Sequence, residues 1–324
     1  MTLECLPFEF TVCQIEDVSD ADLTAPFTFF SCTDEELSLV CPTDRVPART
    51  INRVDNWRAF RIEGTLAFTM TGVLAGVASA LAEDSIPIFA ISTYNTDYIL
   101  VKNEFLAKAK HSLYNSGYTV KDLPLKTIRD YYDKTAADWA ARWYEDDSML
   151  PYLKEFVSLL PENPRIIDVG CGAGYESMRL SGLGADVVGI DISPVSIQIA
   201  RERNPHLDFH VLDMTKNYSE LGLFDGVAAI ASLIHLPNER LCAAFERMTE
   251  VLKPGGLALI SVRHGVGKQT KQSYVTIDGE AYDRGFYAHT LDELIEYSSG
   301  KLTFVQELLP NEDDIWKQYL FRKI

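Results

Sequence analysis

The sequence predicts an α+β domain in the N-terminal part of the chain and a doubly wound α/β domain in the C-terminal part. Three observations support this prediction. Strand-like runs alternate with helix-like segments after about residue 127, and the glycine-rich turn "DVGCGAG" follows the first of these runs. Between residues 57 and 120, the order strand, helix, strand, strand, helix, strand is typical of a ferredoxin-like unit.

The composition is that of a globular protein with an acidic surface. The chain has 324 residues, which is long for one hydrophobic core and suits two domains. Hydrophobic residues make up 47% and charged residues 24%, so a sizeable core can be buried. The net charge of -17 opposes a large phosphate-binding surface, and we therefore expect no nucleic-acid partner.

The cysteine pattern and the apolar stretches indicate the cellular location of the protein. Six cysteines form no C-x-x-C pair and have no histidines at ligand spacing, so we expect reduced thiols and no metal site. The N-terminus "MTLECLPFEFTV" has no basic region, and the apolar stretch at residues 73–82 is too short to span a bilayer. We expect a cytoplasmic protein that does not contact a membrane.

The stretch "SGYTVKDLPLK", residues 116–126, reads as a linker because it combines glycine, proline and charge. We therefore predict an N-terminal domain over residues 1–122 and a C-terminal domain over residues 123–324. In the first domain, residues 7–15 and 27–42 are also strand-rich, and they are candidates for a partial second copy of the ferredoxin-like unit.

The elements of the C-terminal domain follow one another in a regular order. A long amphipathic helix comes first, then alternating strands and helices, as parallel strands with crossover helices require. Ligands of such sheets bind at the carboxyl ends of the strands. The predicted strands are 165–170, 186–192, 207–214, 224–233 and 257–263, and the predicted helices are 128–146, 176–184, 194–204 and 238–252.

Three glycines follow the first predicted strand at every second position. At Gly170, Gly172 and Gly174, missing side chains let backbone N–H groups approach a ligand. The dinucleotide fingerprint G-x-G-x-x-G needs a small residue at position 175, where this chain has Tyr175. The glycines alone leave a simple turn open as the alternative.

Acidic residues end the next two strands. Asp191 lies about twenty residues after the glycines, where a carboxylate can accept hydrogen bonds from both hydroxyls of a ribose. Asp213 ends the third strand and is followed by Met214, a pair that offers a polar contact and an apolar face to an adenine.

Together with "LKPGG" at residues 252–256, these motifs resemble class I S-adenosylmethionine-dependent methyltransferases from about residue 128 to the end. The resemblance implies a Rossmann-like, seven-stranded sheet that closes with an antiparallel hairpin, here residues 302–308 and 315–323. It implies S-adenosyl-L-methionine as the cofactor and a lid tyrosine at Tyr132, with the adjacent Tyr131 as the alternative. The cofactor-binding residues that it implies are Tyr132, Asp168, Gly170, Gly172, Gly174, Asp191, Ile192, Asp213 and Met214.

The sequence gives weaker indications of the residues that contact the methyl acceptor. His235 follows the fourth strand, where it is a candidate catalytic base, or a histidine that only fills the loop. Arg263 and His264 follow the fifth strand as candidates for a substrate carboxylate, or as loop residues in solvent. The "NPPY" or "DPPY" signature of enzymes that methylate nucleic-acid amino groups is replaced by "ASLIHLP". This departure and the charge favour a small-molecule acceptor.

Residues 28–118 resemble ACT-type amino-acid-binding domains, close to those of cytosolic arginine sensors. "LSLVCP" and the run from "RIEGTLAF" to "YILVK" carry the resemblance. It implies an amino-acid effector near residues 71–75 and 92–97, at an interface that a homodimer would complete. The alternative is a packing or oligomerisation module without a ligand.

Two functions therefore compete. The first is methyl transfer to a small molecule, regulated through the ACT-like domain. The second is a sensor that binds the cofactor and an amino acid without turnover. The intact glycines and strand-end aspartates favour the enzyme.

Overall fold

The computed structural model describes residues 1–269, 273–278, 280–310 and 315–324. They form two compact units: Met1–Leu125 with Val275–Ala281, and Lys126–Tyr274 with Tyr282–Ile324. The domain limits drawn from the sequence, 1–122 and 123–324, stay a prediction.

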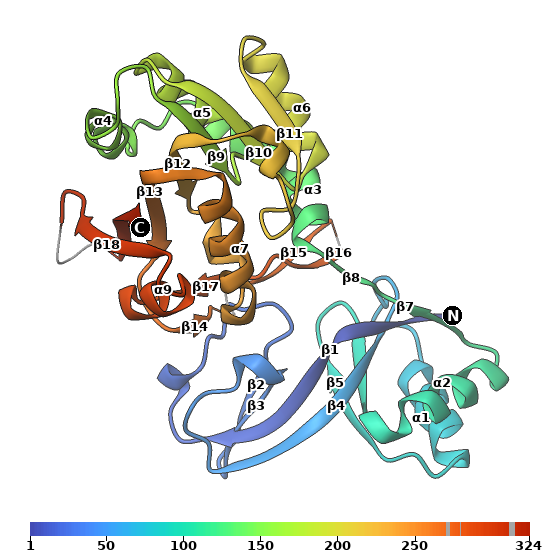
Figure 1. Ribbon diagram of the computed structural model, residues 1–324. Helices are drawn as coiled ribbons and strands as arrows, with labels where there is room; N and C mark the ends of the chain where they lie inside the picture. The colour runs from blue at the N-terminus through green and yellow to red at the C-terminus, as the bar shows by residue number, and fades with distance from the viewer. Residues whose placement is uncertain (270–272, 279, 311–314) are drawn as a thin grey trace. The chain divides into compact units, whose positions relative to one another are not determined.

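A seven-stranded sheet is the centre of the first unit (Figure 1). Among the described residues its strands lie in the order β2-β3-β1-β4-β6-β5, and β7 pairs with β1. β7 runs parallel to β1, and the other neighbours are antiparallel. The bounds are β1 Thr2–Ile15, β2 Phe29–Cys32, β3 Leu37–Pro42, β4 Asn52–Ile62, β5 Ile88–Ser92, β6 Asp97–Lys102 and β7 Thr119–Asp122.

The predicted ferredoxin-like succession is present as β4, α1, β5, β6, α2 and β7, with α1 at Val73–Glu83 and α2 at Leu106–Asn115. Both helices pack on the sheet because each has one apolar face. Val77 and Leu81 of α1, and Leu113 of α2, meet strand residues in one buried cluster. The α+β class of this unit is confirmed.

β1 connects the N-terminal residues to this same sheet. Its start pairs with both β4 and β7, and its later residues, Phe10–Ile15, pair with β3. Residues 7–15 and 27–42 therefore extend one sheet and do not form a second copy with a sheet of its own. β1 separates β4 from β7, the first and last strands of the predicted succession.

A second seven-stranded sheet forms the core of the second unit, in the order β11-β10-β9-β12-β13-β19-β18. The first five strands in this order, β11, β10, β9, β12 and β13, run parallel to one another. β19 and β18 close the sheet as an antiparallel hairpin. This confirms the doubly wound, Rossmann-like class. The bounds are β9 Arg165–Val169, β10 Asp186–Asp191, β11 Asp208–Val211, β12 Phe224–Ile230, β13 Leu252–Arg263, β18 Leu302–Glu307 and β19 Trp316–Lys323.

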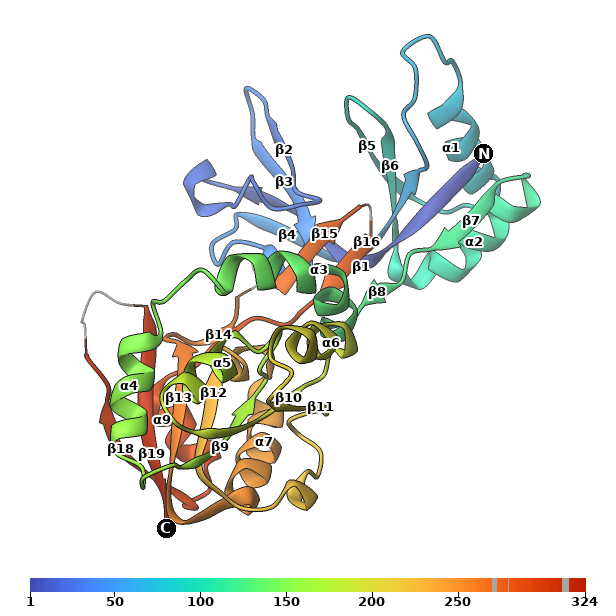
Figure 2. The same ribbon diagram turned by 90° about the horizontal axis from the view of Figure 1, so that it is seen from above.

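Helices cover both faces of this sheet (Figure 2). On one face α7 and α9 pack against the strands, for example through Phe245 and Leu294. On the other face α4 and α5 do so, through Phe156 and Leu180. A strand covered on both faces can be apolar throughout, as "RIIDV" of β9 nearly is. The helix bounds are α3 Ile128–Trp143, α4 Leu150–Ser158, α5 Tyr175–Gly182, α6 Pro194–Arg203, α7 Asn238–Val251 and α9 Leu291–Tyr297.

Short strands follow β13. β14 pairs with β17, and a small sheet has the order β15-β16-β8. None of the helices in the described part of the chain combines the length with the apolarity that a bilayer crossing requires. The bounds are β8 Leu125–Lys126, β14 Gly267–Lys268, β15 Tyr274–Ile277, β16 Glu280–Asp283 and β17 Tyr287–Ala288.

Candidate active site

A cavity of about 450 Å³ lies within the second unit, at the carboxyl ends of the parallel strands. Its walls come from the glycine loop after β9, the ends of β10 and β12, the residues after β11, and α3. This volume is within the range of small-molecule sites. The predicted residues that line it are Tyr132, Gly170, Gly172, Asp191, Ile192, Asp213, Met214 and His235.

The glycine loop needs its glycines for two different reasons. Gly170 has φ +78°, and a Cβ there would lie 2.3 Å from the Cβ of Ser232. Gly174 has φ +82°, and its Cβ would meet Phe209 at 2.9 Å and Ala200 at 3.0 Å. Gly170 therefore keeps the loop close to the end of β12, whereas Gly174 lets the start of α5 pack against β11 and α6. Gly174 does not line the cavity.

Asp191 joins the glycine loop to the start of α6. One carboxylate oxygen accepts the Gly172 N–H at 2.9 Å, and the other accepts the Ser193 N–H at 2.8 Å. Burial raises the pKa of Asp191, and these two amide hydrogen bonds oppose the rise. Each oxygen keeps a further lone pair, so the side chain can still accept hydrogen bonds from a ligand diol.

Asp213, which also lines the cavity, is held in place by its neighbours. Its Oδ1 accepts the Thr215 N–H at 2.9 Å and the Thr215 hydroxyl at 2.8 Å, and its Oδ2 lies 3.2 Å from Arg240. Burial alone would raise the pKa of Asp213, but Thr215 and Arg240 lower it overall. The carboxylate is therefore a fixed, charged acceptor beside the apolar side chain of Met214.

Asp168 lies beneath the loop and is not part of the cavity wall. It is 1% exposed, and the Ser177 hydroxyl donates to its Oδ2 at 2.6 Å. Burial raises the pKa of Asp168 to about 7. In this structure its hydrogen bond joins β9 to α5, and its contact with a cofactor stays a prediction.

His235 and Tyr132 form a hydrogen-bonded pair in the cavity wall. The Tyr132 hydroxyl lies 2.7 Å from Nε2 of His235, and Nδ1 of His235 lies 2.7 Å from the Gly285 carbonyl oxygen. A carbonyl only accepts, so Nδ1 carries the hydrogen and Nε2 accepts from the tyrosine. Burial lowers the pKa of His235 to about 4, so the ring is neutral near pH 7.

Three other sequence candidates take different places. Tyr131 is buried, and its hydroxyl accepts a hydrogen bond from Arg284 at 3.1 Å. Tyr132 lines the cavity and Tyr131 does not, which favours Tyr132 as the lid residue. Arg263 and His264 do not line this cavity either, so the geometry gives no support to their role in binding a substrate here.

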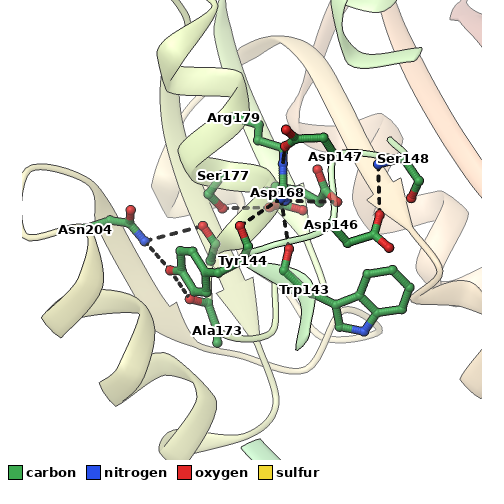
Figure 3. A network of polar contacts seen from close by, with 12 residues as sticks. Trp143, Tyr144, Asp146, Asp147, Ser148, Asp168, Ala173, Ser177, Arg179 and Asn204 are labelled. Atoms are coloured by element: carbon green, nitrogen blue, oxygen red, sulfur yellow. Dashed lines mark hydrogen bonds and ion pairs between the residues drawn. The ribbon is translucent and has the colours of Figure 1, made fainter. Parts of the chain in front are cut away.

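Polar contacts hold the end of α3 on the glycine loop (Figure 3). Tyr144, directly after α3, donates its hydroxyl hydrogen to the Ala173 carbonyl at 2.8 Å and accepts from Asn204 at 2.7 Å. Arg179 of α5 donates to the Trp143 carbonyl at 2.9 Å and lies 3.2 Å from the Asp147 carboxylate. The helix that forms one cavity wall is thus fastened to the loop that forms another.

Several cavity residues belong to no motif that the sequence shows. Glu176 follows the glycines closely, so its position could have marked it as a candidate. Arg284 comes from the segment after β13, where no motif indicates function. In the described part of the chain, no three or more His, Cys, Asp and Glu side chains are grouped to hold a metal ion. The unpredicted lining residues include Trp139, Trp143, Tyr152, Tyr175, Glu176, Ser232, Arg284 and Phe286.

Comparison with family models confirms both resemblances. Residues 52–115 match the model of the ACT domain, and residues 166–256 match the model of a methyltransferase domain. The second match covers the glycine loop, Asp191, Asp213 and His235. The chain therefore carries an ACT domain followed by a methyltransferase domain.

Two O-methyltransferases are among the curated proteins that are similar to this chain. The ubiquinone biosynthesis O-methyltransferase of Xanthomonas axonopodis pv. citri (strain 306) is 34% identical over 143 residues, which are 40% of this chain and 59% of that protein. The magnesium-protoporphyrin O-methyltransferase of Rhodobacter capsulatus is 36% identical over 128 residues, which are 33% of this chain and 56% of that protein. The chain thus spans less than two thirds of the length of each relative.

A solved structure is also similar, that of magnesium protoporphyrin IX methyltransferase from Synechocystis PCC 6803 with bound SAM. It is 19% identical, with a TM-score of 0.45, and the match covers 61% of this chain and 95% of that one. A likeness of this size supports no conclusion about function.

Proposed function

We propose that the second unit transfers a methyl group from S-adenosyl-L-methionine to a small-molecule acceptor. The observation that carries the proposal is the convergence of Gly170, Asp191, Asp213 and Met214 on one cavity at the carboxyl ends of the strands. The methyltransferase-domain match over residues 166–256 supports it.

The residues present fit this cofactor. Asp191 offers carboxylate oxygens to the ribose, and Asp213 with Met214 offers an acceptor and an apolar face to the adenine. Gly170 and Gly172 line the cavity without side chains, so their backbone is open to the methionine part of the cofactor. The Ser232 hydroxyl is buried and, among the described residues, has no hydrogen-bond partner, so it can donate to a ligand.

The bound cofactor would supply an electrophilic methyl group. The protein then has to align the acceptor behind that methyl group and exclude water, which is mainly a matter of position. Tyr132 and His235 close one side of the cavity. With a pKa of about 4, His235 is a weak base in this state, which suits an acceptor that is already nucleophilic when it binds.

A small acceptor agrees with the net charge of -17 and with a cavity of about 450 Å³. The two relatives are named O-methyltransferases, and their names support an oxygen atom as the methyl acceptor. The cytoplasmic location of the enzyme stays part of this proposal.

The proposal is tested by incubating the purified chain with methyl-deuterated S-adenosylmethionine and a small-molecule cell extract. Mass spectrometry should find a metabolite that carries the heavy methyl group, and an Asp191→Ala variant should not produce it. If S-adenosylhomocysteine does not bind the wild-type chain in calorimetry, the proposal is wrong.

A second candidate function is a sensor that binds the cofactor without turnover. The occupied nitrogen atoms of His235 favour it, because neither nitrogen is free to take a proton from an acceptor. Tight binding of S-adenosylhomocysteine without any labelled metabolite would support the sensor. A labelled product would exclude it as the complete function.

We also propose that the ACT domain binds an amino-acid effector, with a homodimer completing the site. The residues just before the first implied segment, 71–75, contact the second implied segment, 92–97, in the first unit. The Leu66 N–H donates to the Asn95 carbonyl at 2.7 Å, and the exposed rings of Phe68 and Tyr94 meet edge to face at 5.3 Å.

This regulatory proposal has its own test. The full chain is screened against the proteinogenic amino acids by thermal shift, and its mass is measured by light scattering with and without the best ligand. A ligand should raise the melting temperature and favour the dimer. If no amino acid shifts the melting temperature and the chain stays monomeric, the domain serves packing alone.

A further inference from the structure

The cavity has a carboxylate in its wall that the proposed function does not use. Glu176 lies in the first turn of α5, is 4% exposed and lines the cavity. Its Oε2 atom is buried, and within the described ranges nothing hydrogen-bonds to it. A buried carboxylate oxygen without a partner is costly, so it indicates a ligand group that is missing from the free protein.

The neighbouring guanidinium does not satisfy this carboxylate. Nη1 of Arg179 lies 3.6 Å from Oε1 of Glu176, which is too long for a good hydrogen bond. Arg179 instead directs its other nitrogens to Asp147 and to the Trp143 carbonyl (Figure 3). Glu176 thus has an ion-pair neighbour but no group that fills its second oxygen.

Burial acts against the charged form of Glu176 and raises the pKa of this carboxyl to about 7. The guanidinium of Arg179 opposes the rise, whereas the carboxylates of Asp168, Asp146 and Asp147 add to it. A cation placed against Oε2 would stabilise the charged carboxylate.

Aromatic rings of α3, of α4 and of the start of α5 line the same cavity. Trp139 and Trp143 are stacked at 6.3 Å between centroids, and Trp143 is stacked on Tyr175 at 6.4 Å. Tyr152 also lines the cavity. Tryptophan and tyrosine faces attract cations, and alkylated ammonium groups are the usual ligands of such ring sets.

We propose that Glu176 and the rings of Trp139, Trp143 and Tyr175 form a subsite for an alkylated ammonium group of the methyl acceptor. The proposal rests on the methyltransferase function and narrows its substrate class to cationic amines. The ammonium group is an anchor, and the atom that receives the methyl group lies elsewhere in the same molecule.

The cofactor carries an ammonium group too, but this subsite suits it less well. A primary ammonium has three N–H donors that all require acceptors. Glu176 offers one unpartnered oxygen, and the other members of the proposed subsite, Trp139, Trp143 and Tyr175, are aromatic. A tertiary or quaternary ammonium needs few or no acceptors, so its alkyl groups can pack on the rings.

The test uses choline and its neutral isostere 3,3-dimethylbutan-1-ol as probes. Intrinsic tryptophan fluorescence follows each titration, with and without saturating S-adenosylhomocysteine. The variants are Glu176→Gln and the matched control Glu162→Gln, which changes an exposed glutamate before β9. Calorimetry with S-adenosylhomocysteine is run on all three proteins.

In the wild type and the control, choline should bind at least tenfold more tightly than the neutral probe. Glu176→Gln should remove most of this difference and leave the affinity for S-adenosylhomocysteine within threefold. Equal binding of the two probes, or an unchanged preference in Glu176→Gln, would overturn the subsite.

Two further outcomes distinguish failure of the proposed subsite from failure of the proposed function. A loss of tenfold or more in S-adenosylhomocysteine affinity in Glu176→Gln would assign the carboxylate to the cofactor and overturn the acceptor subsite. If the wild type does not bind S-adenosylhomocysteine at all, the proposed function fails. The titrations without this ligand would then still decide whether the ammonium subsite exists.

Discussion

The hydroxyl group of Tyr132 donates a hydrogen bond to Nε2 of His235 at 2.7 Å, while Nδ1 of the same ring donates to the Gly285 carbonyl. The tautomer of His235 is therefore fixed from both sides. Tyr132 belongs to α3 and Gly285 to the segment between β16 and β17, so the imidazole joins two parts of the cavity wall that are far apart in sequence.

This pair predicts the effect of Tyr132→Phe. In this structure the hydroxyl donates to the neutral ring, so its removal leaves a buried acceptor nitrogen of His235 without its partner. The lost hydrogen bond should cost about 1 kcal/mol of stability or more. Urea denaturation measures the loss, with Tyr114→Phe, an exposed tyrosine of α2, as the control. An unchanged free energy of unfolding in Tyr132→Phe would contradict the role given to the hydroxyl.

The Asp191 carboxylate predicts a binding defect. Asp191→Ala removes both the proposed ribose acceptor and the bond to the Gly172 amide, so affinity for S-adenosylhomocysteine should fall at least tenfold, or about 1.4 kcal/mol. Asp186→Ala is the matched control, because Asp186 begins the same strand and is exposed. Calorimetry on both variants decides. Equal affinities would remove Asp191 from the cofactor site.

Replacing glycine by alanine should change the stability of the protein differently at Gly170 and at Gly182. Gly170→Ala places a side chain at φ +78° and only 2.3 Å from the Cβ of Ser232, so we expect a loss of about 2 kcal/mol or more. Gly182→Ala, at the end of α5, meets nothing within 4 Å and should be neutral or slightly stabilising. Urea denaturation of both variants measures the difference. Similar stabilities would show that the loop can move away from β12.

Asp168 predicts a dependence of stability on pH. Its folded-state pKa of about 7 lies above the ordinary value of 3.8, so between these pH values the folded state binds more protons than the unfolded state. Its contribution is complete below the ordinary value and is lost as the pH rises toward 7, by up to about 1.4 kcal/mol per pH unit.

Asp168→Asn lacks this titration. Its free energy of unfolding, relative to the wild type, should therefore rise between pH 4 and pH 7. Denaturant curves at several pH values measure the trend. Glu162→Gln, at an exposed position, should show none. A constant difference between Asp168→Asn and the wild type would mean that Asp168 keeps an ordinary pKa in the folded state.

The order of elements was predictable from the sequence because each strand of the second unit reads as an apolar run between turn residues. The glycine loop and the two strand-end aspartates could also be predicted. They follow predicted parallel strands, and the carboxyl ends of such strands share one edge of the sheet. The path of β1 was not predictable, because pairing with β3, β4 and β7 depends on contacts across long stretches of sequence.

Side-chain environments were the least predictable part of the site. The sequence predicted a position near the acceptor for His235, but nothing in it indicated that Tyr132 and Gly285 would occupy both ring nitrogens. Gly174 fits the glycine motif, but the structure explains this glycine by packing. A side chain at this position would collide with Ala200 and Phe209. Glu176 became a candidate only when its unpartnered oxygen and the neighbouring rings were placed together.

The grouping of Val275–Ala281 with the first unit has a consequence for synthesis. The chain leaves the ribosome from its N-terminus, so residues 1–125 emerge well before this segment does. At elongation rates of about 5–20 residues per second, roughly 10–30 s pass between the synthesis of residue 125 and the synthesis of residue 281. During that interval most of the second unit is already being made, so the first unit cannot be completed ahead of it. A ribosome-bound chain that ends before residue 275 should therefore be more sensitive to protease in its first 125 residues than the released protein.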